Sequence, residues 1–216
     1  MTHKTFYMIL DTETCNSIDD PICYDVGFAI IDADGAVYEH HSCVVADVFL
    51  DAELMASAYF ADKIPQYWAD IKAGSRKLMR YHNIRKLIAD TCAKWDVHIA
   101  LAHNMRFDYR STNTTQRFLT CSKYRYFLPY GIELWDTLKM ARAVFKNDDD
   151  YGAFCFENGF MTKRNQRQYT AEVLYRYLTN DPTFEESHTG LEDVMIEKEI
   201  FVECLRRGCE DGKLWE

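Results

Sequence analysis

The sequence has no CxxC pair, no long apolar run and no excess of basic charge, and each absence argues against a class of protein. Its eight cysteines are scattered along 216 residues. We therefore expect free buried thiols rather than a disulfide framework, with a zinc site as the alternative. Cys204 and Cys209, five apart on an expected helix, diverge by about 140° around its axis, so they do not converge naturally on one ion.

Apolar runs are short throughout the chain, and none approaches the roughly 20 residues that a membrane helix needs. The first run, Phe6–Leu10, has one Lys before it and stops at an acid, which is not typical of a signal peptide. We expect a cytoplasmic protein without a membrane partner. With 48% hydrophobic and 27% charged residues, the composition fits one globular domain over residues 1–216.

Basic charge is scarce: 25 Lys and Arg face 34 Asp and Glu, which gives a net charge of −9. Because cations that neutralise phosphates dominate non-specific affinity for nucleic acids, this balance argues against a long, tight nucleic-acid track. Two bound divalent ions would change −9 to −5 at the place where a phosphate lies. The acidity therefore weakens a nuclease interpretation only modestly.

Alternating β-rich runs and helical patterns predict an α/β fold. The β-rich runs are 6–10, 25–31, 37–45, 98–102 and 132–135. The first three, separated by turn signals, predict an antiparallel meander, and the last two, each followed by a helical pattern, predict parallel strands. Together they predict a five-stranded mixed sheet flanked by helices. Helical spacing also predicts an insertion around 49–96 and a last helix over about 190–207.

Two carboxylates, Asp11 and Glu13, stand at the end of the first expected strand. Alternate residues share a face of a strand, so both carboxylates point the same way. The run before them is apolar on both faces, which predicts a central strand, and open α/β sheets bind ligands at the carboxyl ends of such strands. The alternative is that both acids only open a solvated turn.

Two further motifs stand where helices are expected to begin. Asp108 ends the run His103–Asp108, which follows an expected strand. An Asp at this place ordinarily caps or begins a helix, and a functional role is expected only if the strand before it neighbours the first strand. Thr189 and Glu192 match a capping box, which predicts a helix start at Thr189 with Asp193 in its first turn. His188 would then lie outside the helix, free to bend toward Asp193, or it is an ordinary surface histidine.

Four carboxylates gathered within a few ångströms would repel one another. The repulsion is about 4 kcal/mol per pair at 4 Å and an effective dielectric of 20. Hard divalent cations would relieve it, and oxygen ligands suit Mg²⁺ or Mn²⁺ rather than zinc.

Read in order, D-x-E at 11 and 13, H-N-x-x-F-D at 103–108 and H-x4-D at 188–193 resemble the three motifs of the DnaQ-like (DEDDh) 3′→5′ exonuclease superfamily. The resemblance spans residue 7 to about 207 and implies an RNase H-like fold. The histidine subclass is indicated, because the sister group has a tyrosine where Thr189 stands. Cys15 and Gly190 depart from common family residues, which bears on substrate preference more than on activity.

The resemblance implies a site for two divalent cations, Mg²⁺ or Mn²⁺. Asp11, Glu13 and Asp193 would hold one ion, and Asp11 with Asp108 would position the other. His188 would act as the general base for water attack on the terminal phosphodiester, which releases nucleoside 5′-monophosphates.

The same resemblance implies residues that contact the substrate. Thr14 matches the position that meets the terminal 3′-hydroxyl, and the positions flanking the pocket are His103, Asn104 and Phe107. Core packing is the alternative for Phe107. Basic and aromatic residues also interleave at 117–118, 123–127 and 163–167, a mixture that suits single strands and equally a solvated helix face with buried rings.

The expected partner is the 3′ end of single-stranded nucleic acid, with DNA as the preferred substrate. One alternative is an RNA-directed, oligoribonuclease-like enzyme, for which an acidic surface is less of a handicap. Another is a non-catalytic nucleic-acid-binding accessory module. The sequence leaves open whether the chain forms a homodimer or works within a replication complex.

Overall fold

A mixed β-sheet forms the centre of the computed structural model, which describes residues 4–121, 123 and 125–215. Within these residues it has six strands in the order β4-β3-β2-β1-β5-β6. Their bounds are β1 Phe6–Asn16, β2 Pro21–Asp32, β3 Val37–Val45, β4 Lys77–Met79, β5 Ile99–Ala102 and β6 Glu133–Asp136. β1, β2 and β3 form the predicted antiparallel meander, and β5 and β6 continue the sheet in parallel. The RNase H-like mixed sheet is confirmed.

Two strand features differ from the prediction. The sixth strand, β4, pairs in parallel with the edge of β3. β4 has only three residues, which is too short for a pattern of alternating apolar residues to be recognised. It forms a strand because it pairs with β3. β1 also runs past Glu13, where the expected first strand ends, because β2 keeps pairing with it as far as Asn16↔Pro21.

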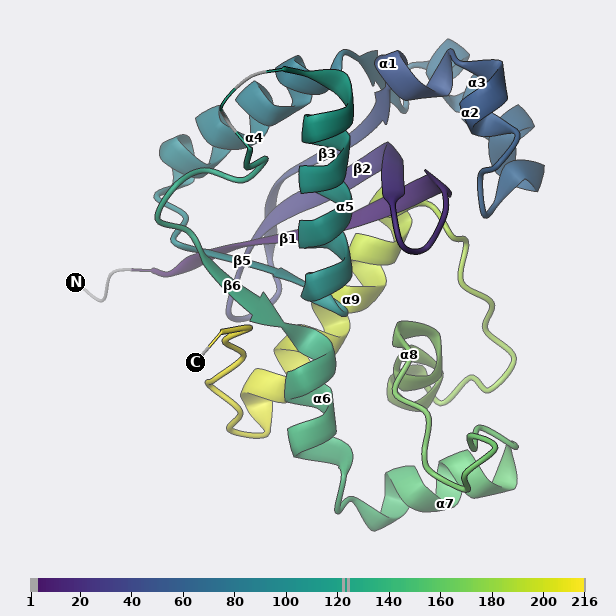
Figure 1. The fold of residues 1–216 in the computed structure, drawn as a ribbon. Helices are drawn as coiled ribbons and strands as arrows, with labels where there is room; N and C mark the ends of the chain where they lie inside the picture. The colour runs from purple at the N-terminus through teal and green to yellow at the C-terminus, as the bar shows by residue number, and fades with distance from the viewer. Residues whose placement is uncertain (1–3, 122, 124, 216) are drawn as a thin grey trace.

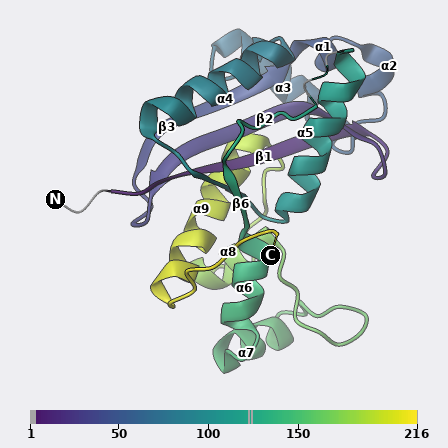
Figure 2. The same cartoon turned by 60° about the vertical axis from the view of Figure 1, so that its left-hand side comes forward.

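Helices cover both faces of the sheet (Figures 1 and 2). One face carries α1 Ala46–Phe49, α2 Ala52–Met55, α3 Ile64–Ala73, α4 Tyr81–Trp95 and α5 Met105–Leu119. On the other face α6 Thr137–Phe145 and α9 Gly190–Arg206 contact the strands, and α7 Asp149–Glu157 and α8 Ala171–Thr179 lie farther from the sheet (Figure 1). Met8 and Leu10 of β1 enter the first core, and Tyr7 and Ile9 enter the second. β1 is therefore central and buried on both faces, as its apolar run predicted.

Residues 49–96, where the sequence predicts a helical insertion, contain α2, a 3₁₀ turn at Ala61–Lys63, α3, β4 and α4. Six of the eight cysteines are buried. Tyr124, part of one basic and aromatic stretch, lies outside the described residues. Among the helices that the structure describes, none is both long and apolar enough to cross a membrane.

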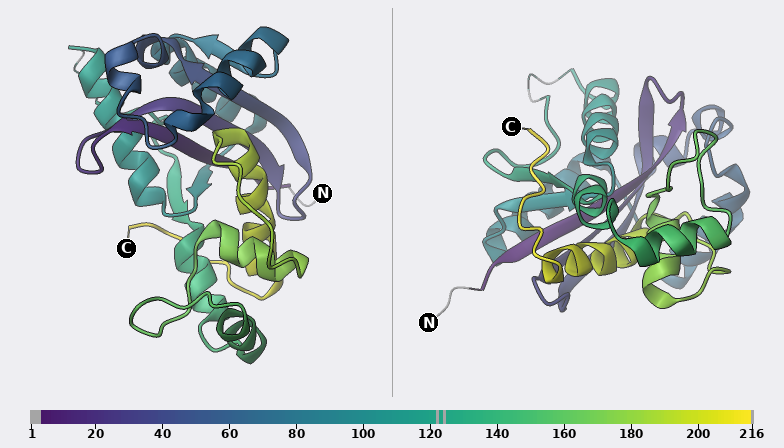
Figure 3. Two further views of the ribbon diagram at one scale, coloured as in Figure 1. Left: turned by 90° about the vertical axis from the view of Figure 1, so that its right-hand side faces the viewer. Right: turned by 90° about the horizontal axis from the view of Figure 1, so that it is seen from below.

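The start of α9 lies directly on the sheet, where the helix crosses β1 and β2 (Figure 3). A Cβ atom built on Gly27 of β2 would come within 2.2 Å of the backbone carbon of Gly190. Only glycine allows such an approach of two backbones. The contact fixes the first turn of α9 against the strand next to β1.

Candidate active site

Asp11 and Glu13 lie on β1, and β5 runs beside them in parallel, with Ile9 paired to Leu101. A functional role for Asp108 is expected only if the strand before it lies beside the first strand. β5 is that strand and it pairs with β1, so the condition is met. The hydroxyl Oγ1 of Thr12 donates to Asp108 Oδ1 at 2.8 Å. The first two motifs therefore meet across the β1–β5 pair.

Asp108 lies in the first turn of α5, but it does not cap the helix. The N-cap is Asn104, which has left-handed backbone geometry (φ 72°), and no side-chain cap bond forms there. The buried Asp108 carboxylate instead faces Thr12 and the cavity. Burial raises its pKa to about 7, against the lowering effect of the Thr12 hydrogen bond.

α9 begins at Gly190 with Asp193 in its first turn, as predicted. The capping box differs from its usual form, because Thr189 Oγ1 donates to Glu192 Oε2 at 2.7 Å and makes no bond to the backbone. The Gly190 N–H donates to Asp25 Oδ2 at 3.0 Å instead. A buried acid on β2 therefore holds the start of the helix that carries Asp193.

The oxygen atoms of Asp11, Glu13 and Asp193 converge, with one from each residue lying within 4.8 Å of the others. Burial, followed by the neighbouring carboxylates, raises the pKa of Glu13 to about 9 and that of Asp193 to about 8. The pKa of Asp11 lies well above its usual value, first through burial and then through Asp108. Within the described residues no Lys or Arg lines this end of the cavity. An all-oxygen, all-acid donor set of this kind fits hard divalent cations.

Sequence reasoning missed Glu197, which faces the same cavity one helical turn after Asp193. Glu197 is 3% exposed and accepts a hydrogen bond from the His103 backbone. Its Oε2 atom, like Asp193 Oδ1, has no hydrogen-bond partner among the described residues. Buried polar atoms are normally paired, so these two oxygens are available to a cation. The i, i+4 spacing from Asp193 is the signal that could have found Glu197.

His188 lies outside α9 with a left-handed backbone (φ 54°) and lines the same cavity. Its ring stacks on Phe60, with ring centroids 4.2 Å apart and planes inclined by 8°. Its Nδ1 atom is 3.8 Å from Glu186 Oε2. Burial lowers the pKa of His188 from 6.5, so the ring is neutral at pH 7.

A second cavity of about 300 Å³ adjoins the carboxylates. Thr14 and Phe107, both expected near substrate, line it together with Tyr59 and Phe60. Phe107 is half-buried and borders both cavities, so it is not purely a core residue. The two cavities share the walls formed by Thr12, Glu13 and Phe107, which makes them parts of one depression.

His103 and Asn104, the other residues expected to flank substrate, line the main cavity. His103 Nε2 donates to the Tyr169 carbonyl at 2.7 Å, which leaves Nδ1 to accept from Thr137 Oγ1 at 3.0 Å. Burial lowers the pKa of His103, so the ring is neutral and both its nitrogens are used inside the protein. The Asn104 backbone N–H donates to Asp136 Oδ1 at 3.1 Å, while its side chain is exposed.

Comparisons with known proteins match this chain at the level of structure. No protein-family model and no curated protein sequence matches it. E. coli exonuclease I in complex with a 5cy-dT13 oligonucleotide has a TM-score of 0.52 at 14% identity, over 92% of this chain and 40% of that one. Exonuclease I with a dT13 oligonucleotide has a TM-score of 0.50 at 15% identity, over 95% and 42%. This chain shares their fold. It spans about two fifths of their length.

Proposed function

We propose that the chain is a metal-dependent 3′→5′ exonuclease that removes nucleoside 5′-monophosphates from single-stranded nucleic acid. The convergence of three distant segments on one buried carboxylate cluster carries this proposal. The fold shared with exonuclease I supports it.

The cluster offers ligands for two divalent cations, Mg²⁺ or Mn²⁺. Asp11, Glu13 and Asp193 would hold the first ion, and Asp11 with Asp108 the second. Glu197 lines the same cavity as Asp108, and burial followed by the nearby Asp108 carboxylate raises its pKa. It would therefore join Asp108 near the second ion. When bound, the ions supply positive charge to the attacked phosphate and acidify the attacking water.

His188 is the base in this proposal. Glu186 lies on the Nδ1 side of the ring, which favours the proton on Nδ1 and would leave the Nε2 lone pair to accept one from water. Stacking on Phe60 holds the ring in place. A pKa below 6.5 keeps His188 unprotonated at neutral pH, as a general base requires.

The smaller cavity would receive the terminal nucleoside. Its volume of about 300 Å³ is at the low end for ligand sites, which suits one nucleoside. Thr14 would meet the 3′-hydroxyl, and the rings of Tyr59, Phe60 and Phe107 would contact the sugar and base. Tyr59 and Phe60 belong to the segment 49–96, so the proposed helical insertion would form one wall of the site.

Single-stranded DNA is the first substrate to test, because the matched exonuclease I structures hold dT13 oligonucleotides. Short RNA is the second candidate, favoured by the net charge of −9, which handicaps binding to long polyanions.

The test follows 5′-labelled dT20 and rU20, with free and blocked 3′ ends, in Mg²⁺, in Mn²⁺ and in EDTA. We expect a ladder that shortens one nucleotide at a time, stops in EDTA and stops when the 3′ end is blocked. Internal cuts in the blocked strand would overturn the 3′→5′ assignment. Strand binding without any shortening would favour the accessory module.

A further inference from the structure

The main cavity, of about 1220 Å³, is sharply divided by charge. One end is lined by six carboxylates: Asp11, Glu13, Asp108, Glu186, Asp193 and Glu197. The other end is formed by α6 and by the segment 161–171, and the residues there that line the cavity include three cations and no acid. A cavity with this polarity suits a ligand that meets metal ions at one end and direct cationic contacts at the other.

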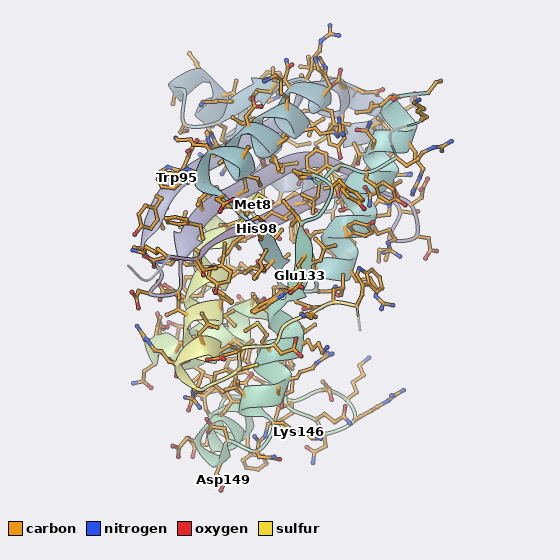
Figure 4. The ribbon with its side chains drawn as sticks, turned by 90° about the vertical axis from the view of Figure 1, so that its left-hand side faces the viewer. Met8, Trp95, His98, Glu133, Lys146 and Asp149 are labelled. Atoms are coloured by element: carbon orange, nitrogen blue, oxygen red, sulfur yellow. The ribbon has the colours of Figure 1, made fainter. Side chains whose placement is uncertain are left out.

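Two of these cations, Arg142 and Lys146, stand on one row of α6. They are four residues apart, which places them about 6 Å apart along the helix axis. Lys146 lies where α6 ends before α7 (Figure 4). Both side chains are exposed, and neither forms an ion pair within the part of the chain that the structure describes. Both cations are therefore available to an anion that enters the cavity.

The opposite wall is a short, well-bonded loop between α7 and α8, which projects in Figure 2. The Thr162 N–H donates to the Gln166 carbonyl at 2.7 Å, and the Asn165 N–H donates to the Thr162 carbonyl at 2.8 Å. The third cation, Arg167, donates through Nη1 to the carbonyls of Phe145, Lys146 and Asp148 at 2.9, 3.1 and 2.7 Å. Arg167 therefore fastens the loop to the end of α6.

Side-chain amides of the loop complete this wall, because Asn165 and Gln166 line the cavity and are exposed. His103 ties the loop to the carboxylate end through the Tyr169 carbonyl. The loop is thus held at a fixed position relative to the metal ligands. Cations together with amide donors on such a frame match phosphodiester oxygens and carry no sequence preference.

We propose that α6 and the loop 161–169 form a binding track for the sugar–phosphate backbone of the strand, on the 5′ side of the bond to be cleaved. Arg142 and Lys146 contact the phosphates, and Asn165 and Gln166 add hydrogen bonds. The track rests on the proposed exonuclease function and assigns the path of its substrate. It is short, so it is compatible with a net charge that argues against a long one.

The test compares Arg142→Glu/Lys146→Glu with the matched control Lys72→Glu/Arg80→Glu. Both variants change the net charge from −9 to −13, and the exposed control residues line neither cavity. Binding of fluorescent dT20 and rU20 is measured by anisotropy over a salt series. Hydrolysis of dT20, of rU20 and of the p-nitrophenyl ester of thymidine 5′-monophosphate is measured with Mn²⁺.

We expect the track variant to bind strands at least tenfold more weakly than the control. The slope of log affinity against log salt should fall by about 1.4, since each single-strand phosphate contact contributes about 0.7. The loss should appear as a higher KM on whichever strand is degraded, by the same factor for DNA and RNA if both are. The ester reports on the carboxylate end alone.

Equal binding by the track variant and the control would overturn the track, whatever the enzyme hydrolyses. A fall in ester hydrolysis equal to the fall on strands would also overturn it, because the pair would then act through the metal site. Failure of the wild type to hydrolyse any substrate would count against the proposed function, while the binding series still decides the track.

Discussion

Two buried acids face each other across β1 and β2, and their surroundings differ. Glu13 is paired in register with Asp25. Asp25 Oδ2 accepts from Tyr67 at 2.7 Å, from the Gly190 N–H at 3.0 Å and from Arg76 at 3.3 Å. Glu13 has no cation beside it among the described residues. One acid thus has its counter-charge within the chain, whereas in the proposed function the other would receive it from bound cations.

Arg76 is the centre of the structural cluster. Its guanidinium, 4% exposed, also donates to Asp70, Ser42 and Glu192, each at 2.9 Å. Burial raises the pKa of Asp25 above its usual value, and Arg76 opposes that effect. This network joins α3, the sheet and the start of α9, so it supports the helix that carries Asp193. The cluster around Arg76 and Asp25 is therefore structural, and it positions the carboxylate cluster of the candidate site.

Removing one acid from the proposed metal site should have the largest effect. Asp11→Asn should lower kcat at least about 10³-fold, because a metal ligand shared by both proposed sites is lost. The same change should stabilise the metal-free protein by relieving carboxylate repulsion, with a gain of about 2–4 °C in Tm for each kcal/mol. Thermal melts in EDTA check this, and Asp25→Asn is the contrasting variant, expected to melt lower than wild type.

Breaking the structural cluster should come next. Arg76→Ala leaves Asp25 buried without its cation, which should cost about 3–5 kcal/mol in the free energy of unfolding. Urea denaturation measures the loss. The double variant Asp25→Asn/Arg76→Met removes both charges and should lose much less. If the double variant is as unstable as the single one, the pairing of Asp25 is not what Arg76 contributes.

A variant of Glu197 tests whether this acid binds a metal ion or is only buried. Glu197→Gln keeps the shape of the side chain and should weaken Mn²⁺ binding about 10–100-fold. Titration of free Mn²⁺ by electron paramagnetic resonance measures it. Glu199→Gln, on the same helix and paired with Lys198 on the surface, is the matched control. Unchanged Mn²⁺ affinity in Glu197→Gln would remove Glu197 from the site.

The stability of the metal-free protein should also depend on pH. Asp108, Asp193 and Glu13 have folded pKa values of about 7, 8 and 9, above their usual 3.8–4.5. The folded metal-free protein therefore holds more protons than the unfolded chain, so its stability should fall as pH rises from about 4 to about 9. We expect the Tm in EDTA to be clearly lower at pH 8 than at pH 6. Saturating Mg²⁺ should flatten the curve, and equal slopes with and without Mg²⁺ would contradict the ion's role.

Activity should follow a different pH dependence. Because burial lowers the pKa of His188 below its usual value, the proton-accepting form predominates at pH 7 and activity should be lost on acidification, which a pH–rate profile measures.

Local patterns predicted the strands and the three motifs, because alternation and turn signals lie within a few residues of each other. Those patterns could not predict β4, whose three residues become a strand only beside β3. They also could not predict that Asp25 accepts the Gly190 N–H in place of the usual capping bond, because the two residues are 165 positions apart in the sequence. The convergence of Asp11 and Asp193 was inferred from the family resemblance and is visible only in the folded chain.

The contact between Gly27 and Gly190 bears on how this site could change. Two main chains touch there, so the separation of β2 from α9 is set by backbone atoms and not by side chains that replacement can enlarge or trim. Repacking elsewhere in the interior would leave the spacing of Asp11 and Asp193 nearly unaltered. An engineer seeking to admit a larger ion would have to start from these two glycines, where even one methyl group would push the helix off its strand.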